Sequence, residues 1–593
     1  MSAETTPQRL LRNAKNYPDE PALSSPHFGG WKTDTWSEFT SFVIQIARSL
    51  IAHGFEAGDK LSIYSYNRKE WYGCYAAAQM VGGAAVGVYH TCSPEEVEWV
   101  VGNSDSKIVF VGNNPMDNNE TDKMPNHRIQ KVLDRLEKVE SAVIMNGVDM
   151  LDNPKMVSWD DFMSKGDSVE ESRVTQKADA INMNDTASLI YTSGTTGNPK
   201  GVELTHDNWF FELEATDTIM EFKQGEKYVS WLPLAHVFGQ LVDNHYWVKN
   251  ALHMYVVNNP LNVVDFAKEI QPHLFIGVPR IYEKVYSNVK ATLDTKAILK
   301  VLLKVPGLSG LLKEKLRKAI GMGSCRFAIT GAAPINPDIL TLFQSLGIPI
   351  FEGYGMTEDT AGATINYGGM NRIGTVGTPF PETEMKVAQD GELLMRGRHV
   401  MKGYYKNPEA TAETIVDGWL HTGDVGEIDA DGFVKITGRK KEIYVTSGGK
   451  NIAPLVIEET MKSIPIVSQC YLVGDGRKFC SALLTLDAGA IIRDKLGVEA
   501  TEVPKDPFAQ IAKLKELGHT LDDFTGSDEV RAEVQAQVDA LNSKFSSPEQ
   551  VKKFTILPRD FTIDDGELTP TLKIRRKQIR ENWSAEIEAM YRE

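Results

Sequence analysis

The chain has 593 residues, of which 24% are charged, and its formal net charge is -16. This length is too great for one ordinary hydrophobic core, so we expect two or more domains. An acidic chain without a basic block is poorly suited to non-specific nucleic-acid binding, and we expect no nucleic-acid partner. The five cysteines are scattered and form no CxxC pair, which indicates a reducing compartment and argues against disulfides or a structural zinc site.

The N-terminus lacks the apolar core of a secretory signal. The most apolar stretch, residues 74–89, is rich in Ala and Gly and is too short to cross a bilayer. We interpret it as a buried helix followed by a buried strand. We therefore expect a cytoplasmic protein without a membrane span, with peripheral attachment to the cytosolic face of an internal membrane as the alternative.

The first two thirds of the chain alternate between helical and strand patterns. Residues 36–54 have helical spacing and end at Gly54. Apolar, β-branched runs typical of strands follow at 60–67, 84–90 and 107–113. This alternation predicts an α/β fold with an open, mostly parallel sheet.

The pattern changes after about Pro379. Residues 385–397 and 425–439 have the pattern of short strands, and Asp431-Gly432 in the second segment predicts a hairpin turn. A basic cluster at 438–445 follows this hairpin, and we place a domain boundary there. The remaining residues suffice for a smaller α/β domain.

A loop rich in Gly, Ser and Thr, Tyr191–Val202, follows a short apolar strand. Its glycines Gly194, Gly197 and Gly201 let the backbone approach a ligand closely. Lys200 supplies a positive charge, but Gly201 follows it, so this is not a Walker A loop. Hydroxyl groups at four positions can donate to phosphate oxygens: Thr192, Ser193, Thr195 and Thr196. We predict a phosphate-binding loop.

This loop resembles the phosphate-binding signature of the adenylate-forming superfamily, which contains acyl-CoA synthetases, beetle luciferases and the adenylation domains of peptide synthetases. Further signatures follow in order as far as Lys573. The resemblance implies a large N-terminal domain, residues 1–437, with doubly wound sheets and a small β-barrel-like subdomain. It also implies a hinge at 438–441 and a smaller, mobile α/β domain at 442–593.

The segment Phe351–Asp359 (FEGYGMTED) matches the superfamily's nucleotide-binding signature. The resemblance implies that Tyr354 stacks on adenine, that Thr357 contacts the α-phosphate, and that Glu358 holds Mg²⁺ together with Thr192. A carboxylate completed by phosphate oxygens and water suits Mg²⁺. Small or backbone-contributing residues are expected to line the nucleotide at six further positions: Gly331, Ala332, Ala333, Gly353, Gly355 and Met356.

The last signatures lie on both sides of the predicted boundary. The segment ending at Asp424 and the one containing Arg439 match residues that bind the ribose. Lys573, in LTPTLKIRRKQI, matches the lysine that reaches the substrate carboxylate and the α-phosphate during adenylation. After rotation of the small domain, a loop containing Gly448 and Gly449 is expected to admit the pantetheine arm of coenzyme A.

Two segments indicate the acyl substrate. LPLAHVFGQ, residues 232–240, resembles the gate of long-chain acyl-CoA synthetases, with His236 as the gating residue. VPRIYEKVY, residues 278–286, and a C-terminal insertion near 475–546 resemble the bubblegum-type branch of those enzymes. The stretch between Arg280 and Gly331 is shorter than in many long-chain synthetases, so the resemblance does not define the tunnel floor.

Residues 296–320 are apolar on one side and rich in Lys and Arg. A packed amphipathic helix pair broken at Pro306-Gly307 explains them, and peripheral membrane contact is the alternative. The sequence does not predict an oligomeric state.

Taken together, the signatures predict an AMP-forming long-chain fatty acid:CoA ligase that uses ATP, Mg²⁺ and coenzyme A. The alternatives are a ligase for a medium-chain or aryl acid, an acyl-AMP ligase without coenzyme A, a luciferase-like oxygenase, and a non-catalytic nucleotide- or acyl-binding protein. An amino-acid-activating domain would normally be followed by a carrier domain.

Overall fold

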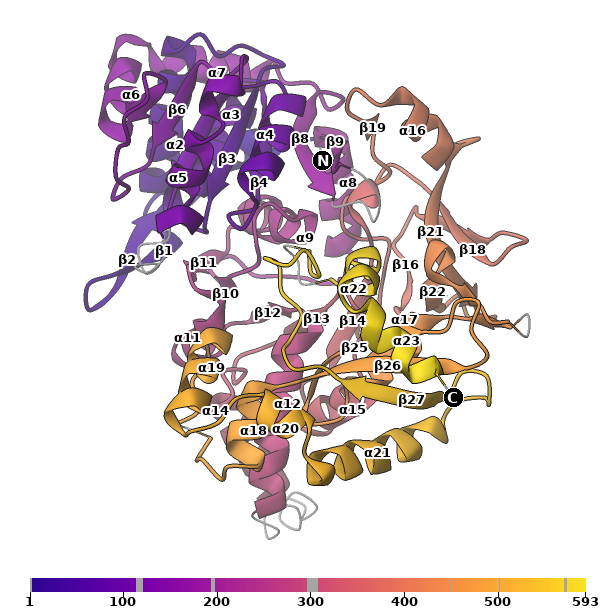
Figure 1. Ribbon diagram of the computed structural model, residues 1–593. Helices are drawn as coiled ribbons and strands as arrows, with labels where there is room; N and C mark the ends of the chain where they lie inside the picture. The colour runs from indigo at the N-terminus through magenta and orange to yellow at the C-terminus, as the bar shows by residue number, and fades with distance from the viewer. Residues whose placement is uncertain are drawn as a thin grey trace.

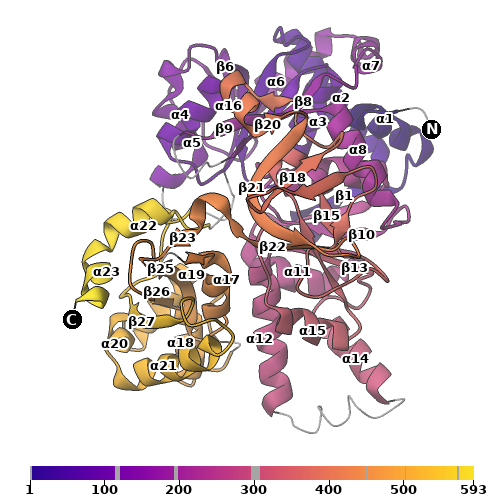
Figure 2. The same ribbon diagram turned by 90° about the vertical axis from the view of Figure 1, so that its right-hand side faces the viewer.

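The computed structural model describes residues 3–113, 121–192, 198–295, 308–447, 450–500, 502–569 and 573–592. These residues form an α/β structure with sheets of nine, eight, five, three and two strands. A large N-terminal region, indigo to salmon in Figure 1, carries the three largest sheets. A smaller C-terminal region, orange and yellow, lies beside it in Figure 2. The predicted α/β class is confirmed.

The eight-stranded sheet has the order β19-β9-β8-β4-β3-β5-β6-β7. Six of its strands run parallel, and β9 and β19 are antiparallel to their neighbours. The strands are β3 (Lys60–Ser65), β4 (Ala84–Val88), β5 (Ser106–Gly112), β6 (Ser141–Ile144), β7 (Met156–Ser158), β8 (Thr186–Thr192), β9 (Lys200–Thr205) and β19 (Gly403–Tyr404).

Helices from the first third of the chain pack near this sheet. They are α1 (Thr6–Asn16), α2 (Trp36–Ala52), α3 (Lys69–Met80), α4 (Pro94–Asn103), α5 (Pro125–Gln130), α6 (Trp159–Lys165) and α7 (Glu171–Asp179). The predicted strands at 60–67, 84–90 and 107–113 correspond to β3, β4 and β5. The segment 74–89 is confirmed as a buried helix, α3, followed by a buried strand.

The nine-stranded sheet has the order β16-β15-β14-β13-β12-β10-β11-β1-β2. Its central strands run parallel, with antiparallel pairs at both edges. The strands are β1 (Pro21–His27), β2 (Gly30–Thr35), β10 (Lys227–Ser230), β11 (His253–Val256), β12 (Leu274–Gly277), β13 (Phe327–Thr330), β14 (Ile350–Tyr354), β15 (Thr364–Ile365) and β16 (Thr378–Pro379).

Further helices lie between and after the strands of the nine-stranded sheet in the middle of the chain. They are α8 (His206–Asp217), α9 (Val237–Gln240), the π-helix η4 (Leu241–Tyr246), α10 (Trp247–Lys249), α11 (Val263–Ile270), α12 (Pro279–Thr295), α14 (Leu308–Ala319) and α15 (Pro337–Ser345). The predicted helix pair at 296–320 is described only from residue 308, as α14. Residues 296–307 lie outside the described residues.

The expected β-barrel-like subdomain is an antiparallel sheet of five strands. Within the described part of the chain, no hydrogen-bonded pairing closes this sheet into a barrel. The long strand β21 is central to this sheet, because it pairs with β18, β20 and β22. The elements are β17 (Glu384–Val387), β18 (Glu392–Arg396), α16 (Pro408–Thr414), β20 (Ile415–Val416), β21 (Trp419–Ile428) and β22 (Val434–Arg439). The predicted hairpin at Asp431-Gly432 joins β21 to β22.

The C-terminal region has its own apolar core, built around a three-stranded sheet and the helices that cover it. Buried residues of this core include Ile457, Met461, Leu484 and Val534. Its elements are β23 (Tyr444–Val445), β24 (Asn451–Ile452), α17 (Pro454–Met461), β25 (Val467–Val473), β26 (Cys480–Leu486), α18 (Ala488–Asp494), α19 (Pro507–Glu516), α20 (Asp522–Thr525), α21 (Asp528–Asn542), β27 (Val551–Ile556), α22 (Arg576–Asn582) and α23 (Ser584–Tyr591).

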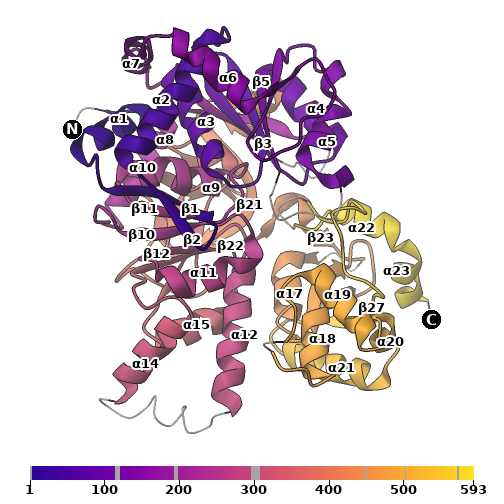
Figure 3. The same ribbon diagram turned by 90° about the vertical axis from the view of Figure 1, so that its left-hand side faces the viewer.

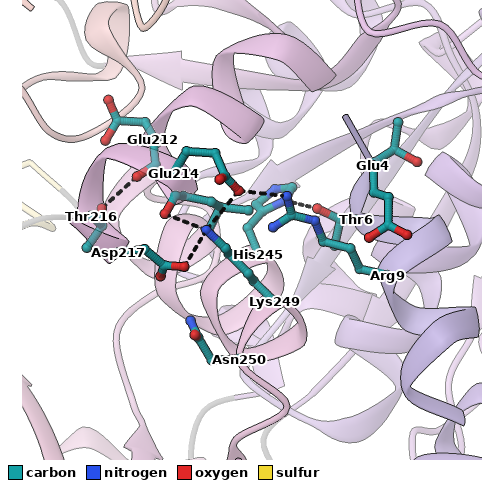
Figure 4. A network of polar contacts seen from close by, with 12 residues as sticks. Glu4, Thr6, Arg9, Glu212, Glu214, Thr216, Asp217, His245, Lys249 and Asn250 are labelled. Carbon is teal, nitrogen blue, oxygen red and sulfur yellow. Dashed lines mark hydrogen bonds and ion pairs between the residues drawn. The ribbon is translucent and has the colours of Figure 1, made fainter. Parts of the chain in front are cut away.

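A polar network ties the N-terminal helix to the segment that follows the predicted gate (Figure 4). Arg9 of α1 and Lys249 both contact the Glu214 carboxylate, at 3.1 and 2.9 Å. His245, in η4, is hydrogen-bonded to the Thr6 hydroxyl at 2.7 Å. π-Helices are rare and are often found at functional sites, and here buried polar contacts fix one beside the gate.

All five cysteines are free thiols, as expected from their spacing. Every helix in the described ranges is too short or too polar to span a membrane.

Candidate active site

The ends of the phosphate loop lie opposite each other on an antiparallel pair. Thr192 is the last residue of β8, and its register partner is Lys200, the first residue of β9. The predicted phosphate ligands Ser193, Gly194, Thr195, Thr196 and Gly197 lie outside the described residues. The Lys200 ammonium lies 4.7 Å from the centre of the Tyr404 ring.

The TED segment forms a short 3₁₀ helix, η6 (Thr357–Asp359). Glu358 is only 8% exposed, yet its carboxylate has a partner, because the Tyr404 hydroxyl donates to it at 2.7 Å. Tyr404 belongs to β19, which pairs with β9. The pairing of two short strands therefore joins Lys200, Tyr404 and Glu358 into one cluster beside the end of the phosphate loop.

The segment predicted to line adenine follows β13. Ala332 has a left-handed backbone (φ 69°), and an added Cβ at Gly331 would lie 3.4 Å from the Gly353 carbonyl oxygen. At Gly355 a Cβ would collide with the carbonyl oxygen of Ala361, so only glycine fits there. These close approaches bring the ends of β13 and β14 together, with Ala333, Tyr354 and Met356 next to them in the chain.

Three contacting side chains join the two ribose-binding candidates to Tyr354. Asp424, on β21, is only 3% exposed. Its Oδ2 accepts a hydrogen bond from the Tyr354 hydroxyl at 2.6 Å, and its Oδ1 lies 3.0 Å from Arg439 Nε. Burial raises the pKa of Asp424, although Arg439, Tyr354 and Lys573 act in the opposite direction. A carboxylate held from both sides has a fixed orientation, as a ribose acceptor requires.

Lys573 lies in a loop anchored by hydrogen bonds. Its backbone N–H donates to the Thr569 hydroxyl at 3.0 Å, and its carbonyl accepts from the Thr569 N–H at 2.8 Å. Arg576, three residues later, forms a two-armed ion pair with Glu458 at 2.6 and 2.8 Å and donates to the Tyr444 hydroxyl at 3.0 Å. The loop is thereby fixed to β23, directly after the predicted hinge.

The charged groups that shift the pKa of Lys573 include the predicted ribose and magnesium ligands. Packing against protein atoms lowers the pKa of Lys573, and Arg439 lowers it further, whereas Asp424 and Glu358 raise it. Burial, followed by the charge of Lys573, lowers the pKa of His236 to about 3. His236 Nδ1 accepts from the Phe238 N–H at 3.2 Å, so the neutral ring carries its proton on Nε2.

The carboxylates near the phosphate loop limit which metal ion could bind there. Within the described ranges, no group of three or more His, Cys, Asp and Glu side chains could hold one. Glu358 contacts Tyr404, the Tyr404 ring lies beside Lys200, and Lys200 is the register partner of Thr192 at the end of β8. Glu358 therefore offers a single carboxylate near the phosphate loop. This arrangement fits Mg²⁺, which commonly takes one or two carboxylates and completes its octahedron with phosphate oxygens and water.

The structure thus brings Lys200, Glu358, Asp424, Arg439 and Lys573 to one place, although they span most of the chain. It also places several residues there that the sequence did not indicate: Tyr404, Thr422, Glu442, Thr569 and Arg576. The density of basic residues after Lys573 could have drawn attention to Arg576, but Tyr404 has no local signal. Gly448 and Gly449 lie outside the described residues.

Comparison with known proteins shows the family to which the chain belongs. The model of the AMP-binding enzyme family matches residues 10–405. The long-chain-fatty-acid–CoA ligase FadD15 of Mycobacterium bovis is 35% identical, over 95% of this chain and 93% of the relative. The human long-chain-fatty-acid–CoA ligase ACSBG2 is 32% identical, over 99% of this chain and 92% of the relative.

Solved structures share the fold. An anthranilate CoA ligase, AuaEII, in complex with anthranoyl-AMP has a TM-score of 0.74 at 18% identity, over 99% of this chain and 98% of the other. The O-succinylbenzoate coenzyme A synthetase MenE of Bacillus subtilis, in complex with ATP and magnesium ion, has a TM-score of 0.67 at 21% identity. That match covers 96% of this chain and 99% of the other. The chain belongs to the AMP-binding enzyme family.

Proposed function

We propose that this protein is an AMP-forming long-chain fatty acid:CoA ligase. The observation that carries the proposal is how the two predicted nucleotide-site carboxylates are held. Tyr354 and Arg439 contact Asp424, and the Tyr404 hydroxyl donates to Glu358 beside the end of the phosphate loop. The names of the relatives, at 31–35% identity over nearly the whole chain, support a long-chain fatty acid as the substrate. ATP and coenzyme A are the co-substrates.

In the first step a carboxylate oxygen of the fatty acid attacks the α-phosphorus of ATP. The new O–P bond gives an acyl-adenylate, the bond to the bridging oxygen breaks, and pyrophosphate leaves with that electron pair. Lys200 and Lys573 neutralise the charge that develops on the phosphate, and Thr357 donates to it. Asp424 and Arg439 fix the ribose, with Tyr354 against adenine. Positioning and electrostatics carry this step.

Glu358 and Thr192 would hold Mg²⁺. Bound there, the ion would neutralise phosphate charge. Tyr404 supports this role because its hydroxyl orients the Glu358 carboxylate at 2.7 Å. The protein would thus supply one oriented carboxylate and the Thr192 hydroxyl, and leave the rest of the coordination sphere to the nucleotide and water.

In the second step the sulfur of coenzyme A attacks the carbonyl carbon of the acyl-adenylate. The C–S bond forms, the C–O bond to phosphate breaks, AMP leaves, and the thiol proton passes to solvent. We place the domains at 1–437 and 442–593 with the hinge at 438–441. Rotation at the hinge removes Lys573 and brings in the loop containing Gly448 and Gly449.

The acyl chain enters past His236. The fixed Nε2–H of this histidine, beside Lys573, makes it a neutral donor at the mouth of the acyl site. We also propose that the protein acts in the cytoplasm and meets its lipid substrate at a membrane surface through α14. Leu311 on that helix is 69% exposed, among Lys and Arg residues that can face anionic headgroups.

The test is release of pyrophosphate with ATP, Mg²⁺ and acids of increasing chain length, with and without coenzyme A. We expect release to rise towards long-chain acids and acyl-CoA to form only when coenzyme A is present. Release only with aryl or medium-chain acids would show that such an acid, and not a long-chain fatty acid, is the substrate. Acyl-AMP that accumulates despite coenzyme A would indicate an acyl-AMP ligase, and no release with any acid would indicate a binding protein.

A further inference from the structure

An ion pair joins the large N-terminal region to the C-terminal region at residues distant in sequence from Lys573. Arg280, near the start of α12, donates through Nη2 to Asp487 Oδ2 at 2.6 Å. The α12 helix is fixed in the large region because Tyr282 and Val285 are buried in its core. Figure 3 shows α12 beside α17 and α18 of the C-terminal region. The sequence segment 278–286 therefore contains an interdomain contact near its start.

Asp487 is held in place from its own side. It is the N-cap of α18, and its Oδ1 accepts from the Ala490 N–H at 2.7 Å. One carboxylate oxygen thus caps the helix, while the other is directed to Arg280. A carboxylate already oriented by a cap loses little further conformational entropy when it pairs with an arginine. Its second oxygen is a rigid receptor for a charge from the large region.

A second pair lies near the first. Lys505, just before α19, forms an ion pair with Asp265 in the first turn of α11. Both small-domain partners, Asp487 and Lys505, come from the insertion near 475–546. The two pairs have opposite polarity, because the large region supplies a cation in one and an anion in the other. Because the charges alternate, one relative position of the two surfaces is favoured over positions that would bring like charges together.

The other end of the small domain is also held by charge. Arg575, two residues beyond Lys573, lies 3.2 Å from Glu96 of α4, whose neighbour Trp99 donates to the Pro199 carbonyl oxygen at 2.9 Å. Figure 2 shows α22 reaching towards α4 and α5. Pairs at both ends therefore coexist with the orientation that brings Lys573 to the nucleotide site.

We infer that Arg280–Asp487 and Lys505–Asp265 form an interdomain latch that selectively stabilises the adenylation orientation. The inference rests on the proposed two-step reaction, and it gives the C-terminal insertion a role. The pairs join surfaces that separate when the small domain rotates, so they stabilise the first orientation and not the second. Arg280 is 54% exposed, and exposed pairs are weak, so the latch biases the rotation without preventing it. These four residues are positioning residues.

The test uses charge reversal and restoration. We expect Arg280→Glu and Asp487→Arg each to slow pyrophosphate release by about fivefold, through loss of the pair and like-charge repulsion. Conversion of supplied acyl-AMP and coenzyme A to acyl-CoA should be unchanged or faster. The double variant, with the charges exchanged, should recover pyrophosphate release to within about twofold of the original protein.

Because Asp487 also caps α18, a second exchange leaves that cap intact. Lys505→Asp and Asp265→Lys should each slow only the first half-reaction, and their combination should restore it. The matched control is Arg396→Glu, which breaks a pair with Glu384 of the same 2.6 Å length within the large region and has a similarly exposed side chain, at 46%. It should change neither half-reaction.

The possible failures are distinguishable. The latch would be overturned if the double variants released pyrophosphate no faster than the single variants. An equal fall in both half-reactions would also overturn it, and either result would leave the proposed ligase activity in place. Original protein that releases no pyrophosphate with any acid would overturn the proposed function, and the latch with it.

Discussion

The two halves of the active site are built differently. One half, from the large region and the proposed hinge, is centred on two buried carboxylates that neighbouring side chains hold, with Tyr354 and Arg439 on Asp424 and Tyr404 on Glu358. The half contributed by the small domain reaches the site through Lys573, and its contacts to the large region are exposed ion pairs. In the proposed mechanism the first half is a preorganised receptor for the nucleotide, and the second supplies a positive charge that leaves when the small domain rotates. Substitutions should separate the two.

The largest effect is expected from Lys573→Ala. Loss of a positive charge aimed at the transition state should slow acyl-adenylate formation by about 10²–10³-fold. Thioester formation from supplied acyl-AMP should stay within about twofold, because Lys573 leaves before that step. Lys577→Ala is the control, since that side chain is 79% exposed on the following helix. An equal loss of both half-reactions in Lys573→Ala would show that the halves are not separable.

Tyr354→Phe should produce the next effect. The ring that stacks on adenine is kept, but Asp424 loses the hydroxyl donor at 2.6 Å. We expect kcat/KM for ATP to fall by about tenfold, as for loss of a hydrogen bond to a charged group. In an Asp424→Asn background the same change should cost much less, because the hydroxyl acts through that carboxylate. Full additivity of the two substitutions would contradict the proposed coupling.

Tyr404→Phe should have a smaller effect, because Glu358 would keep its place in η6 and lose only the orienting hydroxyl. We expect adenylation to slow by about threefold. The adjacent Tyr405→Phe is a matched control, since the Tyr405 hydroxyl contacts Asp105 and Lys60 outside the site. Equal adenylation rates in the two variants would show that the Tyr404 hydroxyl has no role in the site.

The smallest expected effect is a displacement of the pH profile. Protonated Lys573 is the active form, so adenylation should fall as the pH rises through its lowered pKa, below the range of an ordinary lysine. Arg439→Gln removes a neighbouring positive charge, raises that pKa and moves the alkaline limb to higher pH at saturating ATP. In Lys573→Arg the limb should vanish, because a guanidinium does not titrate there. A limb that stays in place in Arg439→Gln would exclude Lys573 as its origin.

Much of the fold was predictable because it depends on local patterns. Buried runs of β-branched residues gave β3, β4 and β5, and Asp431-Gly432 marked the hairpin of β21 and β22. The pairing within the five-stranded sheet was not predictable, because it depends on which strands meet β21 in the folded chain. Periodicity along the chain does not contain that information.

The candidate site divides in the same way. Lys200, Glu358, Asp424 and Lys573 lie in motifs with distinctive spacing, so the sequence indicated them. Tyr404 reaches Glu358 only because β19 pairs with β9, about two hundred residues earlier in the chain. The contact of the Tyr354 hydroxyl with Asp424 also joins residues far apart in sequence. Interactions of this kind require the fold itself.

The most direct test of the proposed function is the identity of the nucleotide product. We expect incubation of the protein with ATP, Mg²⁺, coenzyme A and a long-chain fatty acid to give one AMP and one pyrophosphate for each acyl-CoA formed. Formation of ADP and phosphate, or acyl-CoA without AMP, would contradict the account.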